Sequence, residues 1–244
     1  MTRRTTLLAA ALLALGLAAC GYDLGQVAGV QGSGNVKSES RDVHDFERVE
    51  LAGIGTLNIA QGTAEALTVR AEDNLLPKIG SVVQRGTLTL APVPGAILRP
   101  TKPIVFDLTV KQLRGIEVAG SGDVRASGLT TDQLVLGMSG SGSLATSRTT
   151  ASTITVQLGG SGTVTVSGQT SRQMVTISGS GSYVAPDLSS QQAVVGVSGS
   201  GSSAVNVSDS LTAIVSGSGD VTYRGTPRLQ QHITGSGSVT KSST

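Results

Sequence analysis

Large aromatic side chains are almost missing from this chain of 244 residues, which has no tryptophan, three tyrosines and two phenylalanines. Aromatic residues usually supply much of the area that a globular core buries. Their scarcity argues against an ordinary thick core. Any interior must therefore be thin and lined by Val, Ile, Leu and Ala.

Cysteine and histidine are also scarce, with one cysteine, Cys20, and two histidines, His44 and His232. A single cysteine excludes an internal disulfide. We expect both histidines at the surface or in loops, and neither as a metal ligand or a general base. The sequence predicts no metal site and no cofactor.

An excess of positive charge is absent as well. Lysine and arginine number 18 and aspartate and glutamate 16, and loss of Arg3 and Arg4 with the leader described next makes the two counts equal. A neutral chain lacks the basic surface by which proteins capture nucleic acid or anionic lipid. Nucleic acid is therefore excluded as a predicted partner.

The first residues have the organisation of an export signal. Arg3 and Arg4 precede the apolar run Leu7 to Ala19. This run is shorter than the roughly 20 residues that a membrane-spanning helix needs, and its length is that of a cleaved signal peptide. We predict a signal peptide over residues 1–19.

The residues around Cys20 extend this prediction to a lipid anchor. Leu-Ala-Ala-Cys at 17–20 resembles the bacterial lipobox, which implies cleavage before Cys20 and lipidation of its thiol. Residues 20–33 are Gly-rich and unpatterned, as in a flexible tether. Gly21 resembles the signal that sends lipoproteins to the outer membrane. We expect a cell-envelope protein, with the side of the membrane left open.

What the chain does have is a repeated Gly-Ser-Gly triplet in its second half. Its first glycines are separated by 20, 20, 19, 20, 18 and 18 residues. A fixed period near this length is the signature of a solenoid. The seven triplet serines are Ser121, Ser141, Ser161, Ser180, Ser200, Ser218 and Ser236.

Apolar residues alternate in a constant phase around each triplet. The residues two positions before it are Val118, Met138, Leu158, Ile177, Val197, Val215 and Ile233. Alternation with period two and β-branched side chains favour strands over helices. We predict an all-β fold, a single-stranded parallel β-helix expected to be right-handed, with coils of about 18–20 residues. Val118, Met138, Leu158 and Ile177 should then lie in one buried file.

The predicted β-helix domain spans residues 34–244, with irregular first coils to about residue 115 and regular coils over 116–240. Continuing the alternation through the triplet points both glycines inward and the serine outward. Glycine would be needed there either for a corner with positive φ or for close approach to a neighbouring wall. The pattern leaves both explanations open.

Three segments carry a family resemblance: "GSGNVKSESRDVHDFERVELAGIGTLNIAQG", "LTVRAEDNLLPKI" and "LRGIEVAGSGDV". They resemble bacterial putative adhesins with a head GIN domain. The matching residues are Gly34, Arg41, Val43, Phe46, Val49, Gly53, Leu57, Ile59, Gln61, Gly62, Asn74, Leu75, Pro77, Gly120 and Asp123. The resemblance implies a secreted or lipid-anchored, coil-like, all-β protein, and it supplies no catalytic residues.

Other chemistry for the triplets is poorly supported. No copy opens a helix or carries the lysine of a phosphate-binding loop. Calcium needs six to eight oxygen ligands, and only Asp123 and Asp220 place a carboxylate directly after a triplet.

We therefore predict an envelope lipoprotein that is not an enzyme and has a structural or adhesin-like binding role. The seven triplet serines form the candidate binding surface, and the candidate partners are an envelope or host glycan, a protein, or a second copy of the chain. Lys241 and the polar tail would either blunt the last strand edge or leave it free for self-association. These two outcomes stay open.

The alternative is a polysaccharide-active enzyme with a cleft in the region 35–115. Glu65, Glu72, Asp73 and Lys78 would then be its candidate catalytic residues. A concave site that brings two carboxylates together would favour this alternative.

Overall fold

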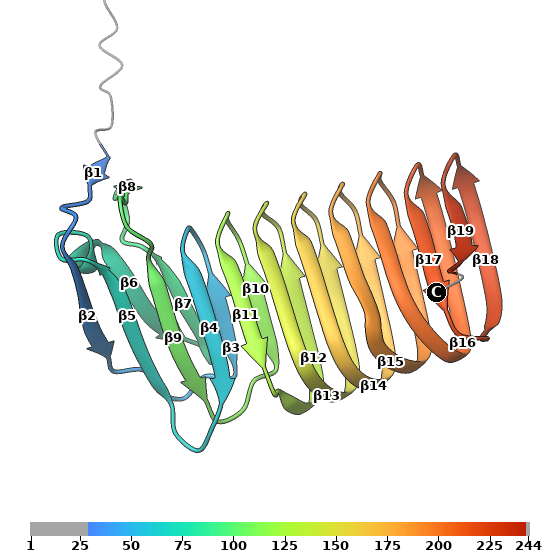
Figure 1. The fold of residues 1–244 in the computed structure, drawn as a ribbon, viewed down its shortest axis with the longest axis horizontal. Helices are drawn as coiled ribbons and strands as arrows, with labels where there is room; N and C mark the ends of the chain where they lie inside the picture. Colours follow the sequence, from blue (N-terminus) through green and yellow to red (C-terminus); the bar gives the residue numbers. More distant parts are fainter. Residues whose placement is uncertain (1–28, 243–244) are drawn as a thin grey trace, which may run out of the picture.

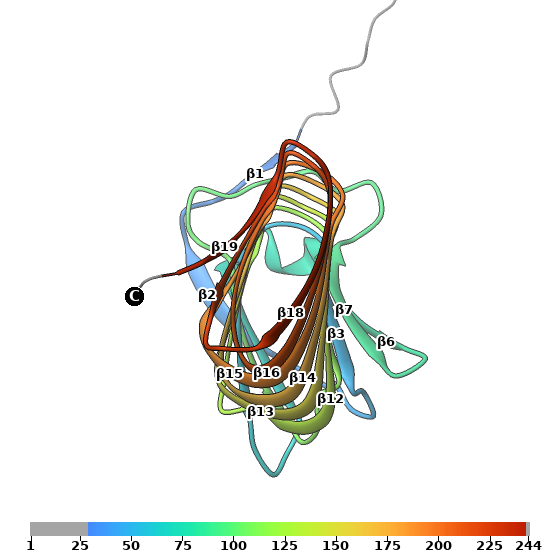
Figure 2. The ribbon, with the colours of Figure 1, turned by 90° about the vertical axis from the view of Figure 1, so that its right-hand side faces the viewer.

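The computed structural model describes residues 29–242, which form an elongated stack of β-strands running across its long axis (Figure 1). Viewed along that axis, the later coils lie behind one another in a flattened outline (Figure 2). The fold is a parallel β-solenoid, as predicted.

Two regions differ in regularity. The first contains β1 (Val30–Gln31), β2 (Val36–Arg41), β3 (Arg48–Leu51), β4 (Thr56–Gln61), β5 (Ala66–Glu72), the 3-10 helix η1 (Leu76–Lys78), β6 (Ile79–Gln84), β7 (Thr87–Pro92), β8 (Leu98–Arg99) and β9 (Val105–Val110). The second contains β10 (Gly115–Val118), β11 (Asp123–Ser127), β12 (Thr130–Met138), β13 (Ser143–Leu158), β14 (Thr163–Ile177), β15 (Ser182–Val197), β16 (Ser202–Gly217), β17 (Asp220–Arg224), β18 (Arg228–Gly235) and β19 (Ser238–Lys241).

The second region stacks in register from coil to coil. Val118 pairs with Met138, Met138 with Leu158, and Leu158 with Ile177, all in parallel ladders. Each of these four side chains is at most 2% exposed. The predicted buried file is therefore confirmed. Because neighbouring strands lie about 4.8 Å apart, each coil seals the apolar interior of the next.

The Gly-Ser-Gly triplets form the narrow loops along the top of Figure 1. β12 ends at Met138 and β13 begins at Ser143, so Gly140 lies at a corner between two strands. A Cβ built on Gly140 would lie 1.8 Å from the carbonyl oxygen of Gly120 in the preceding coil. The backbone N–H of Ser141 donates to that same oxygen at 3.0 Å.

The two explanations for the triplet are thus resolved together. Its position is a corner, and its requirement for glycine comes chiefly from close backbone approach. The first glycines of five copies have φ outside the left-handed region, and only Gly217 and Gly235 have positive values, 139° and 124°. A side chain at these places would push apart the coils and break the ladder that continues through the corner.

One coil of the solenoid comes from far earlier in the chain. β3 and β4 are joined by a Gly53-Ile54-Gly55 corner and lie directly beside β10 and β11. The N–H of Ser121 donates to the carbonyl of Gly53 at 3.0 Å. Triplet serines of later coils, such as Ser141, donate in the same way to the first glycine of the preceding corner. The solenoid therefore begins before the first Gly-Ser-Gly copy, with Gly-Ile-Gly in its place.

The rest of the first region closes one end of the solenoid. β7 and β9 extend the two faces beyond β3 and β4, and antiparallel pairing then appears between β6 and β7, β5 and β9, and β2 and β5. Leu75 and Leu76, at the start of η1, are buried. The region expected to hold irregular coils thus supplies one complete coil and a mixed cap, which covers the apolar interior at this end of the solenoid.

The opposite end is more open. Every residue of β18 is exposed, and Ile233 is 38% exposed although it continues the file of buried Val215. Lys241, at the end of β19, is also exposed. Two predictions for this edge remain: Lys241 and the polar tail prevent it from pairing with another strand, or a second copy of the chain pairs with it.

Candidate functional site

The seven triplet serines form a crest along the narrow corner of the solenoid. We call this crest the serine ridge; its members Ser121, Ser141, Ser161, Ser180, Ser200, Ser218 and Ser236 are all exposed. The predicted outward orientation of these residues is therefore observed. The backbone N–H groups of Ser121, Ser141, Ser161, Ser218 and Ser236 donate to the preceding coil, and all seven side chains point outward.

The broad bend on the other side of the coils carries a hollow that sequence analysis missed. We call it the polar groove; its volume is about 1120 Å³. It is lined by Gln61, Lys111, Gln112, Arg114, Thr130, Thr131, Asp132, Gln133, Thr150, Ala151, Ser152, Gln169, Thr170, Ser171, Ser189, Ser190, Gln191, Asn206 and Ser208. Nearly all of these residues carry hydroxyl, amide or charged side chains.

Strand register lines up one wall of the polar groove. Thr130 pairs with Thr150, which pairs with Gln169. Gln169 pairs in turn with Ser189, and Ser189 with Asn206. These four steps of about 4.8 Å give a column of hydroxyl and amide groups roughly 19 Å long. The groove therefore follows the long axis across five successive coils.

The floor of the polar groove belongs to the core. Thr170 and Ser190 are buried, and the hydroxyl of Ser190 donates to the carbonyl oxygen of Asn206 at 2.7 Å. Ser190 also accepts from the amide of Gln173 at 2.7 Å, and Gln173 accepts from the hydroxyl of Tyr183 at 3.1 Å. Burial raises the pKa of Tyr183, so its phenol stays neutral. This chain of bonds fixes the floor from inside.

Charged groups gather only where the groove meets the first region. Arg114 forms an ion pair with Glu47 at 3.1 Å, and Lys111 forms one with Glu65 at 3.6 Å. The side chain of Gln61 donates to the carbonyl oxygen of Lys111 at 3.0 Å and accepts from the backbone N–H of Thr130 at 2.8 Å. The lysine and arginine of this end are thus matched by carboxylates.

The candidate residues of the enzyme alternative do not converge. Glu65 and Glu72 flank the two ends of β5, roughly 20 Å apart along the strand. Glu65 is engaged by Lys111, and Lys78 is exposed at the end of η1. Glu65 lines a smaller hollow of about 540 Å³ together with Asp45 and Glu47, but Glu72, Asp73 and Lys78 do not line it. The four candidate residues are therefore not gathered in one cleft.

Glu72 has a structural environment instead. Its carboxylate is buried and accepts hydrogen bonds from the Thr101 hydroxyl (2.5 Å), the Thr101 N–H (2.9 Å) and the Gly34 N–H (2.7 Å). The Thr101 hydroxyl is the main cause that lowers the pKa of Glu72, against the opposing effect of burial. A saturated, ionised carboxylate ties two loops of the cap together and cannot act as a general acid.

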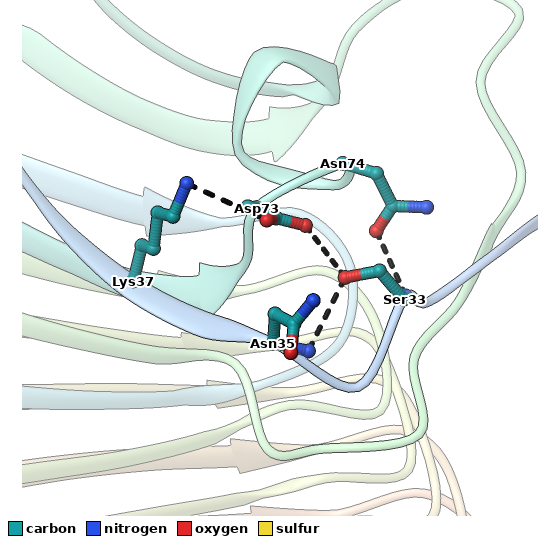
Figure 3. A network of polar contacts seen from close by, with 5 residues as sticks. All are labelled: Ser33, Asn35, Lys37, Asp73 and Asn74. Carbon is teal, nitrogen blue, oxygen red and sulfur yellow. Dashed lines mark hydrogen bonds and ion pairs between the residues drawn. The ribbon is translucent and has the colours of Figure 1, made fainter.

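Asp73 lies beside it in a second polar cluster (Figure 3). The hydroxyl of Ser33 donates to Asp73 at 2.6 Å, and the N–H of Ser33 donates to the side-chain oxygen of Asn74 at 3.0 Å. The Ser33 hydroxyl lowers the pKa of Asp73, with Lys37 contributing from 3.5 Å. This cluster fastens the start of the described chain to the cap.

The structure does not describe residues 1–28. The predicted signal peptide, Cys20 and most of the predicted tether therefore lie outside the described residues. Over residues 29–242 no group of three His, Cys, Asp or Glu side chains could hold a metal ion. The same residues include no helix with the length and apolar character to cross a membrane. His44 is exposed beside Asp45, whose carboxylate raises the pKa of the imidazole.

The groove escaped sequence analysis because its columns drift relative to the triplets. Thr130, Thr150 and Ser189 lie ten residues after the first glycine of their triplets, whereas Gln169 lies nine and Asn206 seven residues after. The drift comes from shifts in strand register at the broad bends. These shifts lie between Thr146 and Thr149, between Thr165 and Gly168, and between Ala185 and Ser189. A search for polar residues in the second half of each repeat, with gaps allowed, would have found the wall.

Comparison with known proteins gives a family and a fold. The family described as "Putative auto-transporter adhesin, head GIN domain" matches residues 45–227. No curated protein matches the chain.

Solved structures of similar fold come from Bacteroides and Parabacteroides. A putative adhesin from Bacteroides fragilis has a TM-score of 0.82 and 25% identity, with 88% of this chain and 100% of that chain covered. A putative lipid binding protein from Parabacteroides distasonis has a TM-score of 0.74 and 24% identity, with the same coverage. A putative adhesin from Parabacteroides distasonis has a TM-score of 0.68 and 25% identity, again with the same coverage.

Proposed function

Since the chain belongs to the family of putative adhesins with a head GIN domain, we propose that it is a binding protein of the cell envelope, attached to a membrane through lipidated Cys20. Its solenoid serves as a stiff arm that presents a repetitive polar surface. It carries out no reaction.

The position of the chain start supports the anchoring part of this proposal. The described chain begins at the capped end, where β1 pairs with β8. A tether from Cys20 would therefore hold the cap toward the membrane. The regular coils would extend away from it, with their long surfaces accessible to a partner.

The observation that carries the binding part is the polar groove. It is a continuous hollow across five coils, and its lining contains only three charged residues: Lys111, Arg114 and Asp132. The candidate carboxylates of the enzyme alternative are separated or saturated by hydrogen bonds. A long polar hollow without converging acid and base groups suits binding better than catalysis.

Membrane fractionation of cells that express the chain tests the anchor. Cys20→Ser should move the protein from the membrane fraction to the soluble fraction, whereas the neighbouring Tyr22→Phe should leave it membrane-bound. Retention of the Cys20→Ser protein in membranes would contradict lipid anchoring.

Capture experiments with the full chain in detergent test the binding role. The protein should retain material from cell-envelope or host-surface extracts, and labelling of intact cells should show on which side it lies. Lysine substitutions at Ser141, Ser161 and Ser180 test the serine ridge: loss of capture would place the contact on the ridge. Absence of any retained polymer or protein would reject the binding role.

A further inference from the structure

We propose that the polar groove binds a neutral, linear glycan whose chain runs along the solenoid axis. This inference names the ligand class and the site of the binding function proposed above, and it rests on that function. The ligand would contact the side chains of successive coils in turn.

The dimensions of the groove suit a polymer. Pockets for small molecules usually have volumes of about 300–1,000 Å³ and enclose most of their ligand. This groove, at about 1120 Å³, is larger, and it extends along the coils. The step between coils, about 4.8 Å, is close to the length of one pyranose unit in an extended chain. One sugar ring can therefore meet one coil.

The wall groups are available for a ligand. Over the described residues, no hydrogen bond within the protein involves the side chains of Thr150, Gln169, Ser171, Ser189 or Gln191. The floor hydroxyls of Thr170 and Ser190, in contrast, are bonded internally. Hydroxyl and amide groups both donate and accept, which matches the mixed donor and acceptor character of sugar hydroxyls.

Charge favours a neutral ligand. Lys111 and Arg114 already pair with Glu65 and Glu47, and Asp132 adds a negative group to the same end. An acidic polysaccharide would find no free row of cations along the hollow.

The backbone around the groove disfavours an extended peptide. β13, β14 and β15 each have a parallel neighbour on both sides, so their ladder N–H and C=O groups are already paired. A peptide could not be added there as a further strand. The small, polar lining also offers an acyl chain no apolar wall.

Affinity should depend on ligand length. Hydrogen bonds to exposed hydroxyl and amide groups are individually weak. Tyr183, which is linked to the floor through Gln173, is buried and offers no ring face to a sugar. Each coil should add a similar small contribution. Binding should therefore strengthen with each sugar unit until the chain spans the groove.

Calorimetric or NMR titration of the full chain in detergent can test this inference. The probes are neutral β-1,3-, β-1,4- and α-1,4-linked gluco-oligosaccharides of two to eight units, with polygalacturonate oligomers as the acidic comparison. At least one neutral series should bind, with Kd falling about tenfold or more between the dimer and the pentamer and then levelling off. Failure of all three neutral series, or stronger binding of the acidic oligomers, would overturn the proposal.

A matched pair of substitutions locates the contact. Ser189→Arg places a large side chain in the polar groove, and Ser180→Arg places the same side chain on the serine ridge of the same coil, where both serines are exposed. The first should weaken binding at least about tenfold and the second less than about twofold. Equal effects of the two substitutions would overturn the groove as the site, provided that both variants keep the wild-type circular dichroism spectrum.

The capture experiment separates this inference from the proposed function. If the wild-type protein binds none of the neutral glycans but still retains a protein from the extracts, the glycan inference fails and the binding function stands. If it retains nothing in either experiment, both fail.

Discussion

The cap and the regular coils cover the same apolar interior by different means. The coils after residue 115 repeat one corner and one set of inward residues, and each is stabilised by a near-copy of itself. The cap uses antiparallel strands, η1 and the buried carboxylate of Glu72. Repetition suffices inside the stack, and at the capped end specific, non-repeated contacts cover the apolar interior. At the opposite end the last repeat is left exposed.

The coil of β3 and β4 joins the two regions and shows which part of the triplet is structural. It keeps both glycines, Gly53 and Gly55, and has Ile54, 36% exposed, where later corners have serine. The glycines therefore make the corner, and the central residue is free to vary. The following substitutions test this division between cap and coils.

The largest effect is expected at a corner glycine. A Cβ on Gly160 would lie 2.1 Å from the carbonyl oxygen of Gly140, whereas one on Gly159 would meet nothing closer than the Ser178 hydroxyl at 3.8 Å. Gly160→Ala should lower the free energy of unfolding by about 3 kcal/mol or more. Gly159→Ala should change it by less than about 0.5 kcal/mol. Urea unfolding of both variants, followed by circular dichroism, measures the contrast; equal midpoints would refute close approach as the reason for glycine.

A smaller effect is expected from the polar chain inside the regular coils. Tyr183→Phe removes the donor to Gln173 and leaves a buried amide oxygen without its partner. The free energy of unfolding should fall by about 1–3 kcal/mol. Gln173→Leu in the Tyr183→Phe background removes the unpaired amide oxygen, but it also removes the hydrogen bond from Gln173 to Ser190. Ser190 keeps its bond to the Asn206 carbonyl, so the double variant should recover part of the loss. An unchanged midpoint in the single variant would show that the bond contributes nothing.

The cap should instead show a dependence on acid. Because the folded state lowers the pKa of Glu72, its carboxylate adds stability above the pKa of the unfolded chain, and this contribution disappears as the pH falls toward the folded value. Between pH 7 and pH 3 the wild-type urea midpoint should fall more than that of Glu72→Gln. Parallel curves for the two proteins would mean that Glu72 does not anchor the cap through its charge.

The smallest effect is expected at the central position of the first corner. Ile54→Ser converts Gly-Ile-Gly into the triplet of the later coils and exposes no new backbone. The free energy of unfolding should change by less than about 0.5 kcal/mol. Thermal unfolding checks this, with Leu57→Ala, a fully buried neighbour in the same coil, as the destabilising control at about 2–5 kcal/mol. A large loss for Ile54→Ser would show that the cap coil depends on its own corner residue.

Much of the regular region could be predicted from sequence because its information is local and repeated. The constant phase of Val118, Met138, Leu158 and Ile177 about the triplets is enough to predict parallel stacking and one buried file. The outward serines follow from the same alternation. Their exposure is confirmed, and a binding role for them stays a prediction.

The candidate site was less predictable. The wall from Thr130 to Asn206 depends on register shifts at the broad bend, and nothing in the spacing of residues reveals where a bulge will form. Glu72 could be considered a candidate catalytic residue because the sequence does not reveal its hydrogen-bond partners. These partners, Thr101 and Gly34, are about 30 and 40 residues away in the sequence. Only the folded cap shows that these neighbours saturate it.

The sequence by itself determined the repeat and the inward and outward faces of each coil, whereas the structure decided that Gly-Ser-Gly makes a corner. The repeat and the two faces follow from the alternation of apolar residues in copies about 20 residues apart. The tertiary structure alone decided that Gly53 lies beneath Gly120, 67 residues later, and that the broad bends line up into a groove. Such contacts join segments with no shared pattern, so their geometry depends on how the intervening chain packs.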